Sequence, residues 1–258
     1  MEKDIIKQKA IEQFTKNAEK YVLSKSHAKG EDLSLLADWL QPQSNWLVLD
    51  IATGGGHVAK TLSPHVKQVF ATDITKEMLA NTQRHLNEYN NIFYIMADAE
   101  NLPFLNDTFD VVTCRIAPHH FPNTSNFINE VTRVLKRNGL FLMIDNVTPK
   151  ERNLAEFMNR FEKLRDESHA RCLSTEEWRE LFSTSNLLEV KSNTRKKTYP
   201  FSNWVERTAN DQQQINKVIQ FILNANQETK SYFNVKSFNK KIQSIQVDEW
   251  MVLCKKGN

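Results

Sequence analysis

Three consecutive glycines, Gly54, Gly55 and Gly56, make up half of the six glycines in the chain. They follow the apolar run WLVLDIA and precede the segment HVAKTLSPH. Glycine between a strand and a helix allows a tight turn and lets a ligand approach the backbone closely. The sequence therefore predicts a ligand held directly against this loop.

Three kinds of ligand fit a glycine-rich loop, and the neighbouring residues separate them. A triphosphate loop requires Lys and Ser or Thr after its last glycine, but His57 follows Gly56 here. The spacing Gly54-x-Gly56-x-x-Ala59 satisfies the dinucleotide fingerprint. However, Asp50 at the end of the preceding strand would repel a pyrophosphate at this point. A dinucleotide stays open as an alternative.

A ligand that carries a cation at the loop removes this conflict. Asp50, Asp73 and Asp98 are spaced by 23 and 25 residues, about one strand and one helix each time. S-adenosylmethionine has an ammonium, a sulfonium and no phosphate. Asp50 would hold its amino-acid portion, Asp73 its ribose hydroxyls and Asp98 the adenine amino group.

Further polar residues follow the predicted strands and are candidates for acting on a second substrate. His119 and His120 form a pair in which either ring is a candidate general base, packing being the alternative. The segment 165–171 brings together residues that would pair with an anionic substrate, with solvation as the alternative. Tyr21, with His27, would close over the methionine end of the ligand, or pack within a helix. The candidate substrate-binding residues are Arg165, His169, Arg171 and Tyr21.

The elements that must position these residues alternate between strand and helix. Helices are expected between most of the strands, including one over 126–139 that ends at Gly139. This alternation predicts parallel βαβ units, whose ligands bind beyond the carboxyl ends of the strands. Asp50, Asp73, Asp98, Arg115 and Asp145 would then lie along one edge. The predicted strands cover 46–52, 67–73, 92–98, 109–117, 140–146, 187–199 and 245–256.

The remaining segments are expected to be mainly helical. Residues 1–45 would form an N-terminal helical cap and residues 46–258 the main domain, with lid helices at about 150–172 and 202–228. Ser174 and Glu177 are spaced as a capping box at the start of a helix over 174–186.

Five segments of the chain resemble, in their order along the sequence, the motifs of class I S-adenosylmethionine-dependent methyltransferases. They are VLDIATGGG, VFATDIT, ADAENLPF, FDVVTCRIAPHHF and VLKRNGLFLMIDN. The resemblance covers roughly residues 10–190. Within the family, the chain looks similar to the ubiquinone/menaquinone-biosynthesis subgroup, and most like small bacterial methyltransferases of unassigned substrate. The resemblance implies an α/β fold. Its doubly wound, Rossmann-like sheet would have seven mostly parallel strands, with the last strand antiparallel.

The resemblance also implies roles for residues around the loop. Thr53 belongs to the same loop as the three glycines. Ile74 and Met78 would pack on the adenosine, while Ala99 and Glu100 would offer backbone N–H groups to adenine. The segment 114–117, which includes Arg115, would run beside the sulfonium, with a structural role as the alternative for Arg115. Two positions depart from the family pattern: Ala52 replaces a glycine, and Arg137-Asn138-Gly139 replaces Pro-Gly-Gly.

Composition limits the other classes of function. A net charge of +3 gives no strong footprint for nucleic acid. No apolar run approaches the roughly 20 residues that span a bilayer, so membrane insertion is not expected. The first residues of the sequence lack the apolar core and cleavage site that a signal peptide would be expected to have. Three scattered cysteines indicate a reducing, cytoplasmic setting. No metal-binding motif is found.

The predicted function is methyl transfer from S-adenosylmethionine to a small-molecule acceptor by in-line displacement. An NAD-dependent oxidoreductase and a non-catalytic adenosylmethionine-binding protein are the alternatives. A nucleic-acid methyltransferase is less expected, because Thr113 rather than proline precedes Cys114 and no Asn/Asp-Pro-Pro-aromatic motif is present. The acceptor atom and the oligomeric state cannot be read from the sequence.

Overall fold

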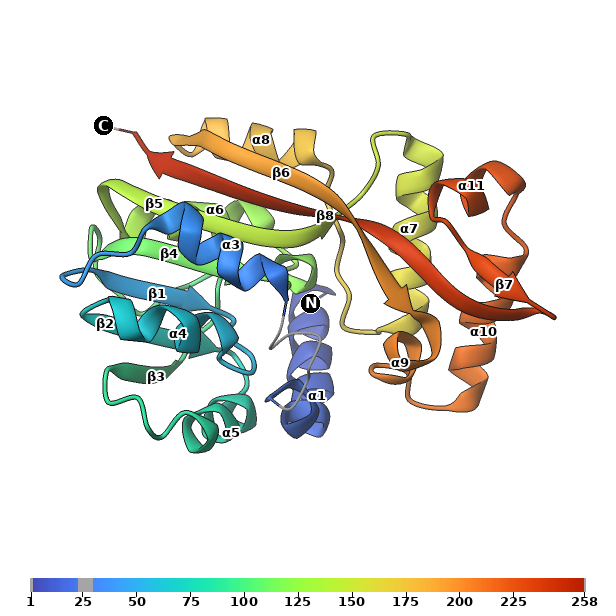
Figure 1. The fold of residues 1–258 in the computed structure, drawn as a ribbon, viewed down its shortest axis with the longest axis horizontal. Helices are drawn as coiled ribbons and strands as arrows, with labels where there is room; N and C mark the ends of the chain where they lie inside the picture. The colour runs from blue at the N-terminus through green and yellow to red at the C-terminus, as the bar shows by residue number, and fades with distance from the viewer. Residues whose placement is uncertain (1, 23–29, 258) are drawn as a thin grey trace.

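The computed structural model describes residues 2–22 and 30–257, and Figure 1 shows its fold. A twisted sheet in the order β3-β2-β1-β4-β5-β8-β6 forms its centre. β1 to β5 are parallel, and β8 alone runs antiparallel to both of its neighbours in this order. The strands are β1 Leu47–Ile51, β2 Gln68–Asp73, β3 Ile92–Met96, β4 Phe109–Arg115, β5 Leu135–Val147, β6 Leu187–Pro200 and β8 Lys241–Lys256.

The expected seven-stranded sheet with an antiparallel last strand is confirmed. One further short strand, β7 (Lys236–Phe238), pairs with β8 as a hairpin and was not predicted. The helices are α1 Glu2–Val22, α3 Glu31–Leu40, α4 His57–Leu62, α5 Lys76–His85, α6 Thr124–Val134, α7 Arg152–Arg165, α8 Thr175–Thr184, α9 Phe201–Glu206, α10 Gln212–Leu223 and α11 Gln227–Tyr232.

Helices cover both faces of the sheet because successive strand residues point to opposite sides. Val48 and Val111 pack with α3 and α4 on one face. Leu49 and Val112 pack with α6 and α8 on the other face. Burial on both sides explains why these strands are apolar throughout instead of alternating with polar residues.

A third core lies beside the sheet, where β6 and β8 extend beyond the other strands. Its apolar residues come from α7, α9, α10 and the first part of β8. We call α7, α9, α10, α11 and β7, together with the adjoining ends of β6 and β8, the lateral layer; it is at the right of Figure 1.

The start of α8 agrees with the sequence-based prediction, and the end of α6 does not. The capping box at the start of α8 is present, with Ser174 and Glu177 each bonded to the other's backbone. The helix predicted over 126–139 is wrong at its end, since α6 stops at Val134 and Leu135 begins β5. Leu135 is fully buried and pairs with Phe109 of β4, so sheet pairing overrides the helical pattern here.

Candidate active site

The loop after β1 adopts the conformation that its glycines allow. Gly54 and Gly56 have φ values of +53° and +72°, in the left-handed region that glycine enters without strain. A Cβ at Gly56 would lie 2.4 Å from Cγ2 of Thr82, whereas one at Gly54 would meet no atom closer than 3.9 Å. Gly56 is therefore needed for close packing on α5, and Gly54 leaves open space above the backbone.

Asp50 lies beneath this loop at the end of β1. Its carboxylate accepts hydrogen bonds from Oγ1 of Thr53 at 2.6 Å and from Oγ1 of Thr113 at 2.8 Å. Burial raises the pKa of Asp50 to about 6, although these hydroxyls and Arg115 favour its ionised form. At neutral pH the group is a buried anion that would attract a cation.

The other two acids of the series also face the loop region. Asp73 ends β2 and accepts hydrogen bonds from the backbone N–H of Gly54 at 3.1 Å and of Thr75 at 2.9 Å. Burial raises the pKa of Asp73 despite these two donors. Asp98 follows β3, and its Oδ1 accepts a hydrogen bond from the backbone N–H of Glu100 at 2.9 Å.

These residues line one cavity with about 1050 Å³ of empty space, counted to its open mouth. That size suits a ligand as large as a nucleoside derivative. Gly56 is the one predicted cofactor-binding residue that does not line it. The predicted residues that do are Asp50, Thr53, Gly54, Gly55, Asp73, Ile74, Met78, Asp98, Ala99, Glu100, Arg115 and His120.

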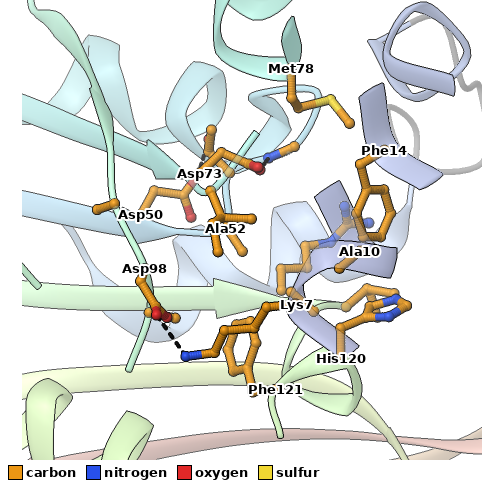
Figure 2. A pocket seen from close by; sticks show the side chains of 18 of the residues that line it. Lys7, Ala10, Phe14, Asp50, Ala52, Asp73, Met78, Asp98, His120 and Phe121 are labelled. Carbon is orange, nitrogen blue, oxygen red and sulfur yellow. Dashed lines mark hydrogen bonds and ion pairs between the residues drawn. The ribbon is translucent and has the colours of Figure 1, made fainter. Parts of the chain in front are cut away.

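Helix α1 of the expected N-terminal cap lies across the same cavity, through residues that the sequence did not single out. Lys7, Ala10 and Phe14 of α1 line it, as Figure 2 shows. The Nζ of Lys7 lies 2.6 Å from Oδ2 of Asp98 and 2.6 Å from Oε2 of Glu100. An amphipathic helix with scattered lysines gives no signal from which these particular ion pairs could be predicted.

Arg115, at the end of β4, is held from outside the sheet. Its Nε donates to Oδ2 of Asp32 in α3 at 2.5 Å. Its Nη2 is buried and has no hydrogen-bond partner among the described residues, although Arg115 lines the cavity. A Cβ built on Gly30 would lie 3.1 Å from this nitrogen, so Nη2 is covered by the chain next to Asp32, and other atoms of Arg115 line the cavity.

His119 lies immediately beyond β4 and is fixed by Asp145 of β5. Nδ1 of His119 lies 2.6 Å from Oδ1 of Asp145, and the backbone N–H of His119 donates to Oδ2 at 2.8 Å. Burial alone would lower the pKa of His119, but the charge and hydrogen bond of Asp145 outweigh it and raise that pKa. The carboxylate thereby fixes the ring and leaves Nε2 as the nitrogen free to accept a proton.

His120 has a different environment from its neighbour. Its Nδ1 lies 3.1 Å from the carbonyl oxygen of Ser168, and its ring meets Phe14 edge to face with centroids 5.0 Å apart. Burial and the adjacent His119 lower the pKa of His120 to about 4. A neutral ring whose Nδ1 is bonded within the fold is a weaker base than His119.

A second, more polar cavity adjoins the first, with about 590 Å³ of empty space. Phe14, Ile116 and His120 line both cavities. His119 lines the second cavity and not the first. The other residues of this second cavity are Asn146, Arg165, Asp166, Lys197, Tyr199, Trp204, Arg207 and Thr208.

Known proteins with similar sequences and structures decide the family. Residues 49–143 match a family model described as a methyltransferase domain. The chain is 36% identical to the uncharacterized methyltransferase YcgJ of Bacillus subtilis, over 85% of this chain and 88% of that protein. The crystal structure of a putative methyltransferase from Bacillus halodurans superposes with a TM-score of 0.86 at 32% identity, over 89% of this chain and all of that one.

The chain belongs to the class I S-adenosylmethionine-dependent methyltransferases. It is also 34% identical to the ubiquinone/menaquinone biosynthesis C-methyltransferase UbiE of Rickettsia typhi, but over only 45% of this chain and 50% of that protein. S-adenosylmethionine is the cofactor of this methyltransferase. The donor set of the first cavity fits it, because buried carboxylates suit its ammonium and hydroxyl groups and the Arg115 guanidinium in the same wall suits its carboxylate.

The predicted substrate-binding residues of this methyltransferase lie in different surroundings, and not all of them line a cavity. Arg165 lines the second cavity, but it is held by Glu162 and Thr208 at 2.6 and 2.7 Å. His169 is buried, its Nε2 lies 3.0 Å from Oδ1 of Asn159, and it lines neither cavity. Burial lowers the pKa of His169 well below its ordinary value.

Arg171 and Tyr21 complete that set. The Arg171 side chain is 60% exposed and pairs with Glu177, so it lies outside both cavities. Tyr21 lies in α1, but its side chain and the whole of His27 lie outside the described residues.

Two further expectations concern the chain as a whole. No helix within residues 2–22 and 30–257 is long and apolar enough to cross a membrane. Across the same residues, no group of three or more His, Cys, Asp or Glu side chains is placed to hold a metal ion. Cys114, Cys172 and Cys254 are buried and free.

Proposed function

We propose that this methyltransferase acts on a small-molecule acceptor, with S-adenosylmethionine in the first cavity and the acceptor in the second. One observation carries the proposal: the two cavities adjoin at Phe14, Ile116 and His120. Asp50, Asp73 and Asp98 line one of them, and His119, which Asp145 holds, lines the other. A methyl donor and a base would then lie on opposite sides of one junction.

The first cavity supports a defined orientation of the cofactor. Asp50 would hold the ammonium, the Arg115 guanidinium the carboxylate and Asp73 the ribose hydroxyls. Asp98 would accept the adenine amino group, while Ile74 and Met78 would pack against the base. A nicotinamide dinucleotide fits this site less well, because its pyrophosphate would meet the buried anion of Asp50.

The reaction would be an in-line displacement at the sulfonium methyl group. The acceptor forms a bond to the methyl carbon as the carbon–sulfur bond breaks, and the electron pair of that bond stays on sulfur. The leaving group is a neutral thioether and needs no acid. Positioning can then supply about 7–11 kcal/mol of the barrier reduction in favourable cases.

His119 would act as general base where the acceptor carries a proton on its nucleophilic atom. Nε2 of His119 takes that proton, and Asp145 stabilises the imidazolium that forms. Ile116, which lines both cavities, marks the junction across which the methyl group would pass.

The test is transfer of a radiolabelled methyl group from S-adenosylmethionine into a cell extract separated into small molecules, nucleic acid and protein. We expect label in the small-molecule fraction with the wild-type enzyme and with His65→Gln, an exposed histidine far from the cavities. We expect His119→Gln to transfer little. Label in nucleic acid or protein would contradict the proposal, and no label in any fraction would favour a non-catalytic binding protein.

A further inference from the structure

Cationic side chains outnumber anionic ones in the wall of the second cavity. Arg165 of α7, Lys197 of β6 and Arg207 after α9 all line it, whereas Asp166 is the single carboxylate among the described lining residues. Arg165 is neutralised locally, since its Nη2 lies 2.6 Å from Oε2 of Glu162. Lys197 and Arg207 are the remaining cations of the wall, and their two charges exceed the single charge of Asp166.

Lys197 belongs to a network of ion pairs behind the wall of the second cavity. Glu249, only 2% exposed, pairs with both Lys197 and Arg195. Arg195 also lies 3.5 Å from Oδ1 of Asp32, which already holds Arg115. Asp32 and Glu249 thus link Arg115, Arg195 and Lys197, and of these three cations Lys197 is the one that lines the second cavity. Glu31 approaches Arg195 only at 3.8 Å and is 95% exposed, so solvent screens its contribution.

Lys197 stays charged in this setting. Burial alone would lower its pKa, but the neighbouring Tyr199 and Glu249 hold the pKa of Lys197 above its ordinary value. Lys197 therefore contributes a positive charge to the wall of the second cavity.

Arg207 provides the second cation and is held less tightly. Its side chain is half-buried and lines the cavity. No ion pair or hydrogen bond of Arg207 is recorded within the described ranges. A guanidinium with unused donors in a cavity wall suits a planar carboxylate, which it binds through two parallel hydrogen bonds.

We propose that the acceptor is a small hydroxy acid whose carboxylate lies against Arg207 and Lys197 while its hydroxyl lies at His119. This inference rests on the proposed function. The hydroxyl proton passes to Nε2 of His119, the hydroxyl oxygen bonds to the methyl carbon, and the carbon–sulfur bond breaks with its electrons left on sulfur. Tyr199 and Trp204 in the wall suit a planar acceptor.

The test compares three phenols of similar size and different charge on the protein loaded with S-adenosylhomocysteine. The probes are 4-hydroxybenzoate, 4-hydroxybenzamide and 4-hydroxybenzylamine, and saturation-transfer NMR measures their binding. We expect the benzoate to bind about tenfold or more tightly than the amide, and the amine to bind most weakly. An equal or reversed order would overturn the inference.

Variants of Arg207 sharpen the comparison, because replacing Lys197 would leave Glu249 with one fewer partner and could disturb folding. Arg207→Gln should remove about tenfold of the preference for the benzoate, and Arg207→Glu should turn the preference toward the amine. Arg137→Gln, an exposed arginine on β5 away from the cavities, is the matched control and should keep the wild-type order. An unchanged preference in Arg207→Gln would also overturn the inference.

A calorimetric titration with S-adenosylhomocysteine alone distinguishes a failure of the proposed function from a failure of the inference about the acceptor. If that compound fails to bind, the proposed function fails and this inference fails with it. If it binds and the benzoate shows no preference, the inference about the acceptor fails alone.

Discussion

Asp50 and His119 are both buried titratable residues, but their partners give them different protonation behaviour. Burial raises the pKa of Asp50 to about 6, because it outweighs the hydroxyls of Thr53 and Thr113, the charge of Arg115 and the backbone of Ala59, which all favour the ionised form. The fold favours the protonated form of Asp50, so the stability it contributes is present below its unfolded pKa and is lost as pH rises through about 6. His119 has a carboxylate at 2.6 Å, which raises its pKa despite burial.

The pKa of Asp50 predicts how cofactor affinity depends on pH. The ammonium of S-adenosylhomocysteine would be held by the ionised carboxylate, so its affinity should fall by about tenfold per pH unit below about 6. Calorimetric titrations between pH 5 and 7.5 would measure this fall. Asp50→Asn should bind weakly at every pH, and a wild-type affinity that does not change over this range would contradict the assignment.

His119 should affect catalysis without affecting cofactor binding. His119→Gln is expected to lower kcat by about 10²- to 10⁴-fold while leaving S-adenosylhomocysteine affinity unchanged. Since the neutral imidazole is the active form and its pKa is raised, wild-type rates should increase with pH through a value above 6.5. In Asp145→Asn this increase should move to lower pH, because burial then dominates. A profile that does not move would indicate that Asp145 is only structural.

At the scale of the elements, the sequence predicts the parallel strands and the acids at their ends well. Strands buried on both faces are continuous apolar runs, and acids spaced by one strand and one helix reach the same edge. Contacts between distant elements could not be predicted this way. Asp32 meets Arg115 across 83 residues, and Lys7 meets Asp98 across 91. Those pairs depend on how helices pack, which no local pattern encodes.

Helix α1 yields a prediction that depends on one of those contacts. Lys7 pairs with Asp98 and Glu100, and binding of adenine at Asp98 would have to weaken this ion pair. A partly exposed pair contributes up to about 1 kcal/mol, so Lys7→Met should bind S-adenosylhomocysteine up to about fivefold more tightly. Lys3→Met, an exposed lysine on the same helix, should bind like the wild type. Weaker binding by Lys7→Met would instead assign Lys7 to cofactor recognition.

At the scale of the whole molecule, β6 and β8 join the cofactor-binding sheet to the lateral layer. The second cavity lies between them, since Ile116 and His119 come from the sheet edge and Trp204 and Arg207 from the lateral layer. Residues 150–172 and 202–228, expected to form a lid, supply most of the helices of this layer. We therefore expect the lateral layer to govern the acceptor and the sheet to govern the cofactor.

A core substitution in the lateral layer should separate these two activities. Phe233 is fully buried, and its ring lies 5.5 Å from that of Phe157 and 5.6 Å from that of Phe161. Phe233→Ala should lower the free energy of unfolding by about 3–5 kcal/mol, measured by chemical denaturation. S-adenosylhomocysteine affinity should stay within about twofold of wild type while acceptor turnover falls. An equal loss of S-adenosylhomocysteine affinity and acceptor turnover would contradict the assignment of the cofactor to the sheet and the acceptor to the lateral layer.

The most direct measurement is a calorimetric titration of the wild-type protein, Asp73→Ala and Asp38→Ala with S-adenosylhomocysteine. Asp38 is an exposed carboxylate on α3 and serves as the matched control, while Asp73→Asn checks that the fold is kept. The wild type and Asp38→Ala should bind one equivalent, and Asp73→Ala should bind at least about tenfold more weakly. Undiminished binding by Asp73→Ala, or binding of NADH in place of S-adenosylhomocysteine, would contradict the assignment of the first cavity to the methyl donor.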